Sequence, residues 1–262
     1  MDKLLARTVS INPQRKIRKI VFFGGEKGGV GKSMSTSTAV EFCLEKELKF
    51  ILAECDRVNP DTARIYRPNA DVLFAYFSED PNKRAKADPV VKAAVDSSLV
   101  LCNLPAQSYQ AMKDWFIEDG LYELGQEYNI AFYHWYVSNG GYDSVQIFIK
   151  SLKELGSYMQ HIFVRNWGLC DDWTHVEDHR DMKAARAEYN FPIIDLPKLP
   201  YAERNFIEDY NFSRKKDEDK LTFTSAVTHP ELSLVSRKRI KNFLRDSFAQ
   251  IESTGILSDE KP

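Results

Sequence analysis

A glycine-rich run that ends in a lysine and a serine could bind the phosphates of a nucleotide. The run covers residues 27–33 and reads Lys-Gly-Gly-Val-Gly-Lys-Ser. Glycines let the backbone curl until successive N–H groups point at one anion, and the first turn of a following helix adds partial positive charge. Lys32 would contact the β- and γ-phosphates, and the hydroxyl of Ser33 would bind Mg²⁺. We predict a phosphate-binding loop here, in preference to an ordinary glycine turn.

A strand and a helix are needed to hold such a loop. Residues 20–24 form a short apolar run that is typical of a buried β-strand, and residues 34–42 are expected to begin a helix. The generic motif requires a glycine at position 26, where this chain has Glu26 followed by Lys27. The loop therefore lies in the right setting but departs from the generic motif at its start.

Acidic or amide side chains end two later apolar runs. Residues 49–56 predict a second strand that ends in Glu54 and Asp56, and residues 98–105 predict another that carries Asn103 near its end. Open α/β sheets bind ligands at the carboxyl ends of parallel strands, so these side chains are expected beside the loop. A carboxylate such as Asp56 can orient a water for attack on the γ-phosphate. The alternative is a solvated acid at a strand end.

Strands and helices are predicted to alternate along the whole chain. This pattern favours an α/β fold, with a doubly wound, mostly parallel sheet and helices on both faces. The aromatic run at 130–137 is expected to be a buried central strand rather than a cofactor site. Further strands are predicted at 71–77 (near a sheet edge), 160–166 and 191–200, and helices at 88–96, 107–127 (with a break near its glycines) and 143–155.

The composition is that of one large soluble domain. The chain has 262 residues, of which 43% are hydrophobic and 28% charged, and its net charge is −2. No global field would attract nucleic acid or an anionic membrane, so such binding would need a local patch. We expect a basic arm at 1–18, a single P-loop domain at 19–252 and a short acidic tail at 253–262.

Cysteine usage and hydropathy indicate a cytoplasmic protein. The four cysteines are widely spaced and three of them lie in apolar segments, which favours free thiols in a reducing compartment. The first residues lack the apolar core of a signal peptide, and no apolar run approaches membrane-spanning length. The cysteines are Cys43, Cys55, Cys102 and Cys170.

The run at 27–33 resembles the deviant Walker A motif of the ParA/MinD family of ATPases. In that family the residue before the first lysine varies, and this lysine reaches the partner's nucleotide in an ATP-sandwich dimer. Lys27 holds the matching position. The resemblance implies a P-loop NTPase fold, ATP or ADP with Mg²⁺ as cofactors, and a homodimer formed on ATP binding. It implies nucleotide contacts from Gly28, Gly29, Val30, Gly31, Lys32, Ser33 and Met34.

The resemblance also assigns roles at the strand ends. The family's second strand ends Asp-x-Asp, where Glu54 matches the first acid and Asp56 the second, which positions water and acts as a switch. Residues 57–61 would be the switch loop, and Lys27, Lys32 and Asp56 the catalytic residues. In relatives an asparagine after a late strand and a later proline-containing exit lie at the adenine, and the matching residues are Asn166, Pro197 and Leu199.

Two positions depart from the family pattern. Asn103 stands where the Walker B segment has an aspartate that holds a water on Mg²⁺, and an amide can hydrogen-bond that water but supplies no charge. Mg²⁺ would then be held by Ser33, Asp56 and, through water, Asn103. Met34 stands where relatives often have a second hydroxyl residue. Asn103 weakens the metal site and argues against fast hydrolysis.

A long helix is predicted after residues 229–231. Its apolar stripe, expected to pack on the sheet, consists of Ile240, Phe243, Leu244, Phe248 and Ile251. ParA-type proteins bind DNA through basic C-terminal surfaces, so the opposite face is a candidate DNA contact, with a solvated charged face as an equal alternative. That face carries Arg237, Lys238, Lys241 and Arg245. The acidic tail that follows is a poor membrane anchor.

A pair of histidines provides a weaker candidate site. His175 and His179 are four residues apart among acids, so on a helix they would share a face and could bind a metal. Because no third ligand stands at a motif spacing, a polar surface helix is the preferred interpretation.

Three functional hypotheses remain. The first is a ParA-like ATP-dependent dimerisation switch with slow hydrolysis and a stimulating partner protein, which acts in plasmid or DNA partition, transfer or cargo positioning. The second is a nucleotide-binding adaptor that does not hydrolyse ATP, which Asn103 and Met34 favour. The third is an ATP-dependent enzyme such as a ligase, against which Lys27 argues because a lysine that acts on a partner suits a dimer.

Overall fold

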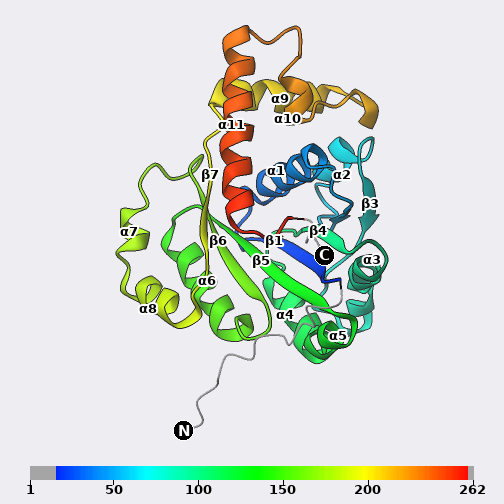
Figure 1. Cartoon of the computed structure of the whole chain (residues 1–262), viewed down its shortest axis with the longest axis vertical. Coiled ribbons are helices and arrows are strands. Elements are labelled where there is room, and N and C mark those ends of the chain that lie inside the picture. The colour runs from blue at the N-terminus through cyan, green and yellow to red at the C-terminus, as the bar shows by residue number, and fades with distance from the viewer. Residues whose placement is uncertain (1–15, 259–262) are drawn as a thin grey trace.

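The computed structural model describes residues 16–258. Within them lies one seven-stranded sheet, in the order β3-β2-β4-β1-β5-β6-β7, and all neighbouring strands in it are parallel. Helices cover both faces of the sheet (Figure 1). The predicted doubly wound α/β fold is confirmed. Most of the predicted basic arm at 1–18 lies outside the described residues, as do the last four residues.

The elements have the following bounds. The strands are β1 (Arg18–Gly24), β2 (Ile51–Glu54), β3 (Asp71–Phe74), β4 (Leu99–Asn103), β5 (Ile130–Ser138), β6 (Gln160–Asn166) and β7 (Ile193–Leu196). The helices are α1 (Lys32–Glu45), α2 (Asp61–Tyr66), α3 (Pro89–Ser97), α4 (Tyr109–Glu118), α5 (Leu121–Tyr128), α6 (Tyr142–Leu155), α7 (Thr174–Glu177), α8 (Arg180–Tyr189), α9 (Tyr201–Ser213), α10 (Phe223–Ala226) and α11 (Leu234–Ser253), with 3₁₀ turns η1 (Pro81–Ala87) and η2 (Asp217–Asp219). Across residues 16–258, none of the helices combines the length and the apolar character needed to span a membrane.

Most of these elements match the predicted ones. Strand β3 lies at the edge of the sheet, and β5 is central and buried, both as predicted. The helix predicted at 107–127 breaks at Gly120, whose φ is 67°, into α4 and α5. Helices α9 and α10 are additions that the sequence pattern did not predict.

Strand β1 supplies side chains to cores on both faces of the sheet. Val21 and Phe23 lie in one core and Ile20 and Phe22 in the other, because successive side chains of a strand point to opposite faces. The first core packs α1, α9, α10 and α11 against the sheet, and the second packs α3, α4 and α5. A third, smaller core lies under α6 and α8. The sheet is thus covered by helices on both sides, and the loop after β1 emerges from its centre.

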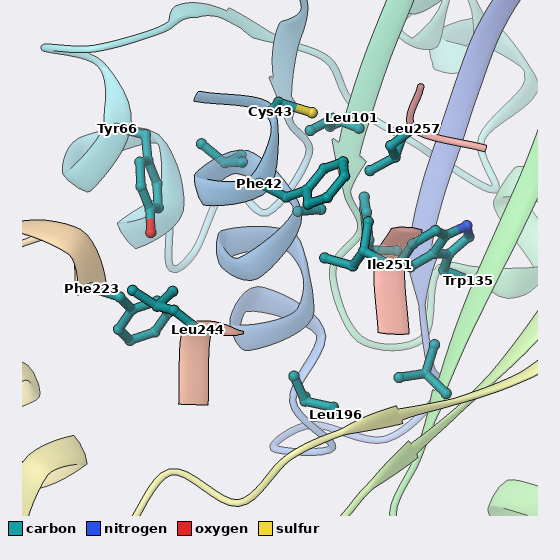
Figure 2. Packing of buried hydrophobic residues seen from close by; sticks show 14 of the residues in the cluster. Phe42, Cys43, Tyr66, Leu101, Trp135, Leu196, Phe223, Leu244, Ile251 and Leu257 are labelled. Atoms are coloured by element: carbon teal, nitrogen blue, oxygen red, sulfur yellow. The ribbon is translucent and has the colours of Figure 1, made fainter. Parts of the chain in front are cut away.

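Helix α11 packs through its predicted apolar stripe. Leu244 and Ile251 of this helix lie in the same core as Phe42 of α1 and Trp135 of β5 (Figure 2). Phe248 is partly buried, and its ring meets that of Phe42 edge-on at 5.6 Å between centroids. The helix that follows the phosphate-binding loop is therefore held between the sheet and α11.

The chain after α11 also packs on the domain. Ile256 and Leu257 are buried in the first core. Nζ of Lys19, at the start of β1, donates to the backbone oxygens of Ile256 at 3.0 Å and Ser258 at 3.2 Å. Residues 256–258 are thus held against the start of β1, at the end of that strand opposite the loop.

Helix α1 carries a glutamate that is almost fully buried. Glu41 accepts hydrogen bonds from the hydroxyl of Tyr66 in α2 (3.0 Å) and from the N–H and hydroxyl of Thr224 in α10 (3.1 and 2.6 Å). Burial raises the pKa of Glu41, and these hydrogen bonds act in the opposite direction. One carboxyl group therefore ties the helix after the loop to α2 and α10.

Glu41→Ala is expected to lower the free energy of unfolding by about 2 kcal/mol, because the hydroxyl of the buried Tyr66 would lose its acceptor and the exposed Thr224 would lose both of its hydrogen bonds to α1. Urea-induced unfolding measures this change. Glu45→Ala, at an exposed position of the same helix, is the matched control and should change the stability by less than about 0.5 kcal/mol. Equal stability of the two variants would show that the hydrogen bonds of Glu41 are dispensable.

Candidate nucleotide-binding site

The predicted phosphate-binding loop joins the end of β1 to the start of α1. Helix α1 begins at Lys32, directly after Gly31, whose φ of 102° lies in the left-handed region that favours glycine. A Cβ at Gly31 would lie 2.3 Å from Nδ2 of Asn166, so the position also lacks space for a side chain. Within residues 16–258 no side chain caps this helix, and its first turn has no acid. Its first N–H groups can therefore face an anion.

Lys32 is buried at the base of the loop. Its side chain is 8% exposed, and its Nζ donates to the backbone oxygen of Lys27 at 3.0 Å. Burial lowers the pKa of Lys32, while the charges of Asp56 and Glu26 act to raise it. Among the described residues Lys32 forms no ion pair. A buried ammonium group without an ion-pair partner favours the binding of an anion beside it.

Lys27 lies at the surface of the loop instead. Its side chain is 49% exposed, and its Nζ pairs with Oδ2 of Asp143 in the first turn of α6 at 2.8 Å. This pair borders a cavity of about 500 Å³. The cavity is lined by Glu26, Lys27, Gly28, Gln107, Asp143, Gln146 and Ile147. The two lysines of the loop thus differ, since Lys32 is buried and Lys27 is half-exposed and paired with Asp143.

The first turn of α1 presents a polar and an apolar side chain. Ser33 is exposed, and the structure describes no side-chain hydrogen bond of its hydroxyl within residues 16–258. Met34 is partly buried, and its side chain packs against the first core. A nucleotide contact by Met34 would therefore come from its backbone N–H. At the tip of the loop Gly28 and Gly29 are exposed, while Val30 is buried.

The carboxyl ends of β2 and β4 meet next to α1. Glu54 and Asn103 face each other in register, and Nδ2 of Asn103 donates to Oε1 of Glu54 at 2.9 Å. The hydroxyl of Thr36 in α1 lies 3.2 Å from Oδ1 of Asn103, to which it can donate. Burial raises the pKa of Glu54 to about 7, although its hydrogen bonds act in the opposite direction. We did not predict from the sequence that Thr36 belongs to the site. Its position one helical turn after Lys32, on the same face of α1, could have indicated this.

Asp56 organises the loop that follows β2. Its Oδ1 accepts hydrogen bonds from the N–H groups of Val58 at 2.9 Å and Asn59 at 3.0 Å. Its negative charge acts on Lys32 across the site. The structure thus places Asp56 between the buried lysine and the predicted switch loop, and its role toward water stays a prediction.

The oxygen donors at this edge suit Mg²⁺, which prefers hard oxygen ligands in octahedral geometry. They are the hydroxyl of Ser33, the carboxylate of Asp56 and the amide oxygen of Asn103. Because Nδ2 of Asn103 is bonded to Glu54, the amide oxygen is the atom left facing α1. The residues present fit a nucleotide with Mg²⁺, and they would hold it through water at Asn103.

The residues predicted at the adenine have contacts of their own. Nδ2 of Asn166 donates to the backbone oxygen of Val30 at 2.8 Å, and its Oδ1 accepts from the N–H of Gly168 at 2.9 Å. The amide of Asn166 therefore holds the loop in place. Leu199 is buried in the first core, and Pro197 is partly buried. Base contacts by these three residues stay a prediction.

The basic residues predicted to bind DNA lie on α11. Lys238, Lys241 and Arg245 are exposed, whereas Nε of the partly buried Arg237 donates to the backbone oxygen of Leu232 at 3.0 Å. Arg245 also pairs with its neighbour Asp246. The N-terminal half of α11 projects beyond the sheet beside α9 and α10 (Figure 1).

The two histidines do not share a helix face. His175 lies in α7 and its Nε2 is 2.8 Å from the backbone oxygen of Gly140, whereas His179 is the N-cap residue of α8. Within residues 16–258 no group of three or more His, Cys, Asp or Glu side chains could hold a metal ion. The four cysteines are free thiols, and Cys170 alone among them is not buried.

Comparison with known proteins gives a fold likeness and one short sequence match. The chain is similar in fold to ParA and MinD ATPases. It resembles MinD from Aquifex aeolicus (14% identity, 94% of this chain and all of that chain, TM-score 0.47) and the septum site-determining protein MinD complexed with Mg-ADP from Pyrococcus horikoshii (15%, 93% and 100%, 0.49). It also resembles a ParA family ATPase from Chlorobium tepidum (11%, 88% and 99%, 0.48). These sequences differ too much from this chain to transfer an activity.

The sequence match is to Protein MobD from Acidithiobacillus ferrooxidans. It is 37% identical over 62 residues, which are 24% of this chain and 27% of that protein. The match thus spans about a quarter of the relative's length. No family model matches the chain.

Proposed function

We propose that this chain is a nucleotide-dependent dimerisation switch of the ParA/MinD type, which binds ATP with Mg²⁺ at the 27–33 loop and hydrolyses it slowly. The observation that carries the proposal is the separation of the two lysines. Lys32 is buried under the loop, and Lys27 is half-exposed at its surface. Because Lys32 would fill the phosphate-binding role in its own loop, the half-exposed Lys27 would be available to contact the nucleotide of a second copy.

The residues of this chain divide the work between them. The N–H groups at the start of α1 and the Lys32 ammonium would stabilise negative charge on the phosphates. Asp56 would orient the attacking water, and Mg²⁺ would supply charge neutralisation when bound. Asn103 offers a neutral amide where a carboxylate would strengthen the metal site, which supports slow rather than fast turnover.

A partner surface on α11 belongs to the same proposal. From Leu232 to Arg245 the chain carries five basic residues and no acid. Lys238, Lys241 and Arg245 are exposed on a helix end that projects from the domain (Figure 1), while Arg239 pairs with the buried Glu203 of α9 at 3.0 Å. Such a local patch suits the phosphates of DNA, with the switch controlling when two copies bind together.

The alternative is a nucleotide-bound adaptor that does not hydrolyse ATP. The observation that favours it is Asn103, which is hydrogen-bonded through Nδ2 to Glu54 and brings no charge of its own. In this alternative the protein would bind the nucleotide as a structural cofactor, and its mass would not respond to the nucleotide state.

Solution mass by light scattering separates the two functions. We expect a monomer without nucleotide and with Mg-ADP, and a dimer with Mg-ATP. Lys27→Ala should stay monomeric with Mg-ATP while ADP binding is unchanged, because the Lys27 side chain is exposed and, within residues 16–258, pairs with Asp143 alone. Asp143→Ala is the matched control, since it removes the partner of Lys27 and leaves the lysine free to act. A mass that does not respond to nucleotide would favour the adaptor.

A further inference from the structure

Asn103 carries no negative charge at the end of β4, but the neighbouring strand β2 ends in a carboxyl group, that of Glu54. Glu54 ends β2 and Asn103 ends β4, and the two residues are paired in register and are each 1% exposed. Nδ2 of Asn103 donates to Oε1 of Glu54 at 2.9 Å and lies 3.3 Å from the hydroxyl oxygen of Thr62. The end of β2 thus places a carboxyl group directly against the amide at the end of β4.

This contact decides which way the amide points. When ionised, the Glu54 carboxylate only accepts hydrogen bonds, so in that state the NH₂ of Asn103 must face Glu54 and its oxygen must face the other way. The other side is α1, where the hydroxyl of Thr36 lies 3.2 Å from Oδ1. Without Glu54 the amide could rotate and present its NH₂, which cannot accept from a water bound to Mg²⁺.

Glu54 is itself held firmly. Its Oε1 accepts from the N–H of Asp56 at 3.0 Å, and its Oε2 accepts from the N–H of Ala63 in α2 at 3.1 Å. The carboxyl group is thereby fixed between β2, β4 and the first turn of α2. A negative charge that cannot rotate away acts on a cation at this edge even though it does not touch it.

We propose that Glu54 is a positioning residue for the divalent cation that accompanies a nucleotide. It fixes Asn103 with the amide oxygen toward α1, and it supplies from β2 the negative charge that Asn103 lacks on β4. The inference rests on the proposed nucleotide site, and it adds that the metal site is rearranged rather than lost.

The test is the effect of Mg²⁺ on ADP affinity, measured by calorimetry at pH 8 with and without the ion. In Glu54→Gln we expect ADP affinity without Mg²⁺ to stay within about threefold of the wild type, and the enhancement by Mg²⁺ to fall about tenfold, a loss that matches one charge-assisted contact. Glu203→Gln, at another glutamate that is 1% exposed but lies in α9, should leave the enhancement unchanged.

A second pair of variants keeps the proposal testable if Glu54→Gln folds poorly. Asn103→Asp alone sets two carboxyl groups at the position of the 2.9 Å contact and should lower the thermal midpoint. The double variant Glu54→Gln with Asn103→Asp carries one charge again, and it should recover both the midpoint and most of the Mg²⁺ enhancement.

The outcomes separate this proposal from the function on which it rests. Full Mg²⁺ enhancement in Glu54→Gln would overturn it, and so would equal losses of affinity with and without Mg²⁺, which indicate a purely structural role. If Glu54→Gln does not fold, an Mg²⁺ enhancement that fails to return in the folded double variant overturns it. Wild-type protein that binds neither ADP nor Mg-ADP would instead reject the nucleotide site.

Discussion

Lys32→Ala is expected to lower the affinity for Mg-ADP by about 100-fold or more, which corresponds to about 2.7 kcal/mol. The Lys32 ammonium is buried, has no ion pair among the described residues and bonds only a backbone oxygen of its own loop. Lys32 can therefore replace its hydrogen bond to the backbone oxygen of Lys27 by charge-assisted hydrogen bonds to phosphate. Each of these contributes about 1.5–3 kcal/mol. Calorimetric titration with Mg-ADP at pH 7 measures the loss.

The variant should remain folded, since no carboxylate in residues 16–258 loses an ion pair with Lys32. Lys46→Ala is the matched control, because Lys46 lies at the other end of α1 and pairs with Glu252 at the surface. It should bind Mg-ADP like the wild type. Tight Mg-ADP binding by Lys32→Ala would mean that the loop does not hold the phosphates, and the proposed function would fail with it.

The loop and the order of the elements could be predicted because their signals are local. The run at 27–33 carries its own spacing, and each buried strand appears as a short apolar run, since both faces of a parallel sheet are covered. Helix α9 gave no such signal. It buries Ile207 but leaves Phe212 93% exposed, so its apolar residues do not form one clear stripe.

The contacts that shape the site could not be predicted because they join distant parts of the chain. Asn166 was assigned to the base by its place after a strand, and its amide bonds Val30, 136 residues away. Asn103 looked like a simple loss of charge, and only the register of β2 and β4 shows Glu54 against it. In both cases the hydrogen-bond partner of a side chain lies on a distant segment. The order of the strands in the sheet decides which segments are adjacent, and the local sequence does not.

Glu54 should also make the stability of the nucleotide-free protein depend on pH. Burial raises its pKa from 4.5 to about 7 in the folded state, so the folded protein prefers the protonated carboxyl group. This preference costs nothing below the unfolded pKa, where the group is protonated in both states. Between pH 4.5 and 7 the unfolded chain releases the proton first, and stability falls as pH rises. A gap of about 2.5 pH units at about 1.4 kcal/mol each predicts a fall of about 3 kcal/mol.

Glu54→Gln isolates this contribution, because a glutamine resembles the protonated side chain and does not titrate. Because the glutamine NH₂ replaces an oxygen that accepts a hydrogen bond, the two proteins can differ in stability by a constant amount, but relative to the variant the wild type should lose about 3 kcal/mol between pH 4 and pH 8. Urea-induced unfolding without nucleotide or Mg²⁺ measures both. Glu41 remains in both proteins, so its own raised pKa cancels in the comparison. Parallel stability curves would show that the three N–H donors around Glu54 keep it ionised throughout. Curves that diverge as pH rises would show that the charge placed against Asn103 is held at a cost in stability that a bound cation can offset.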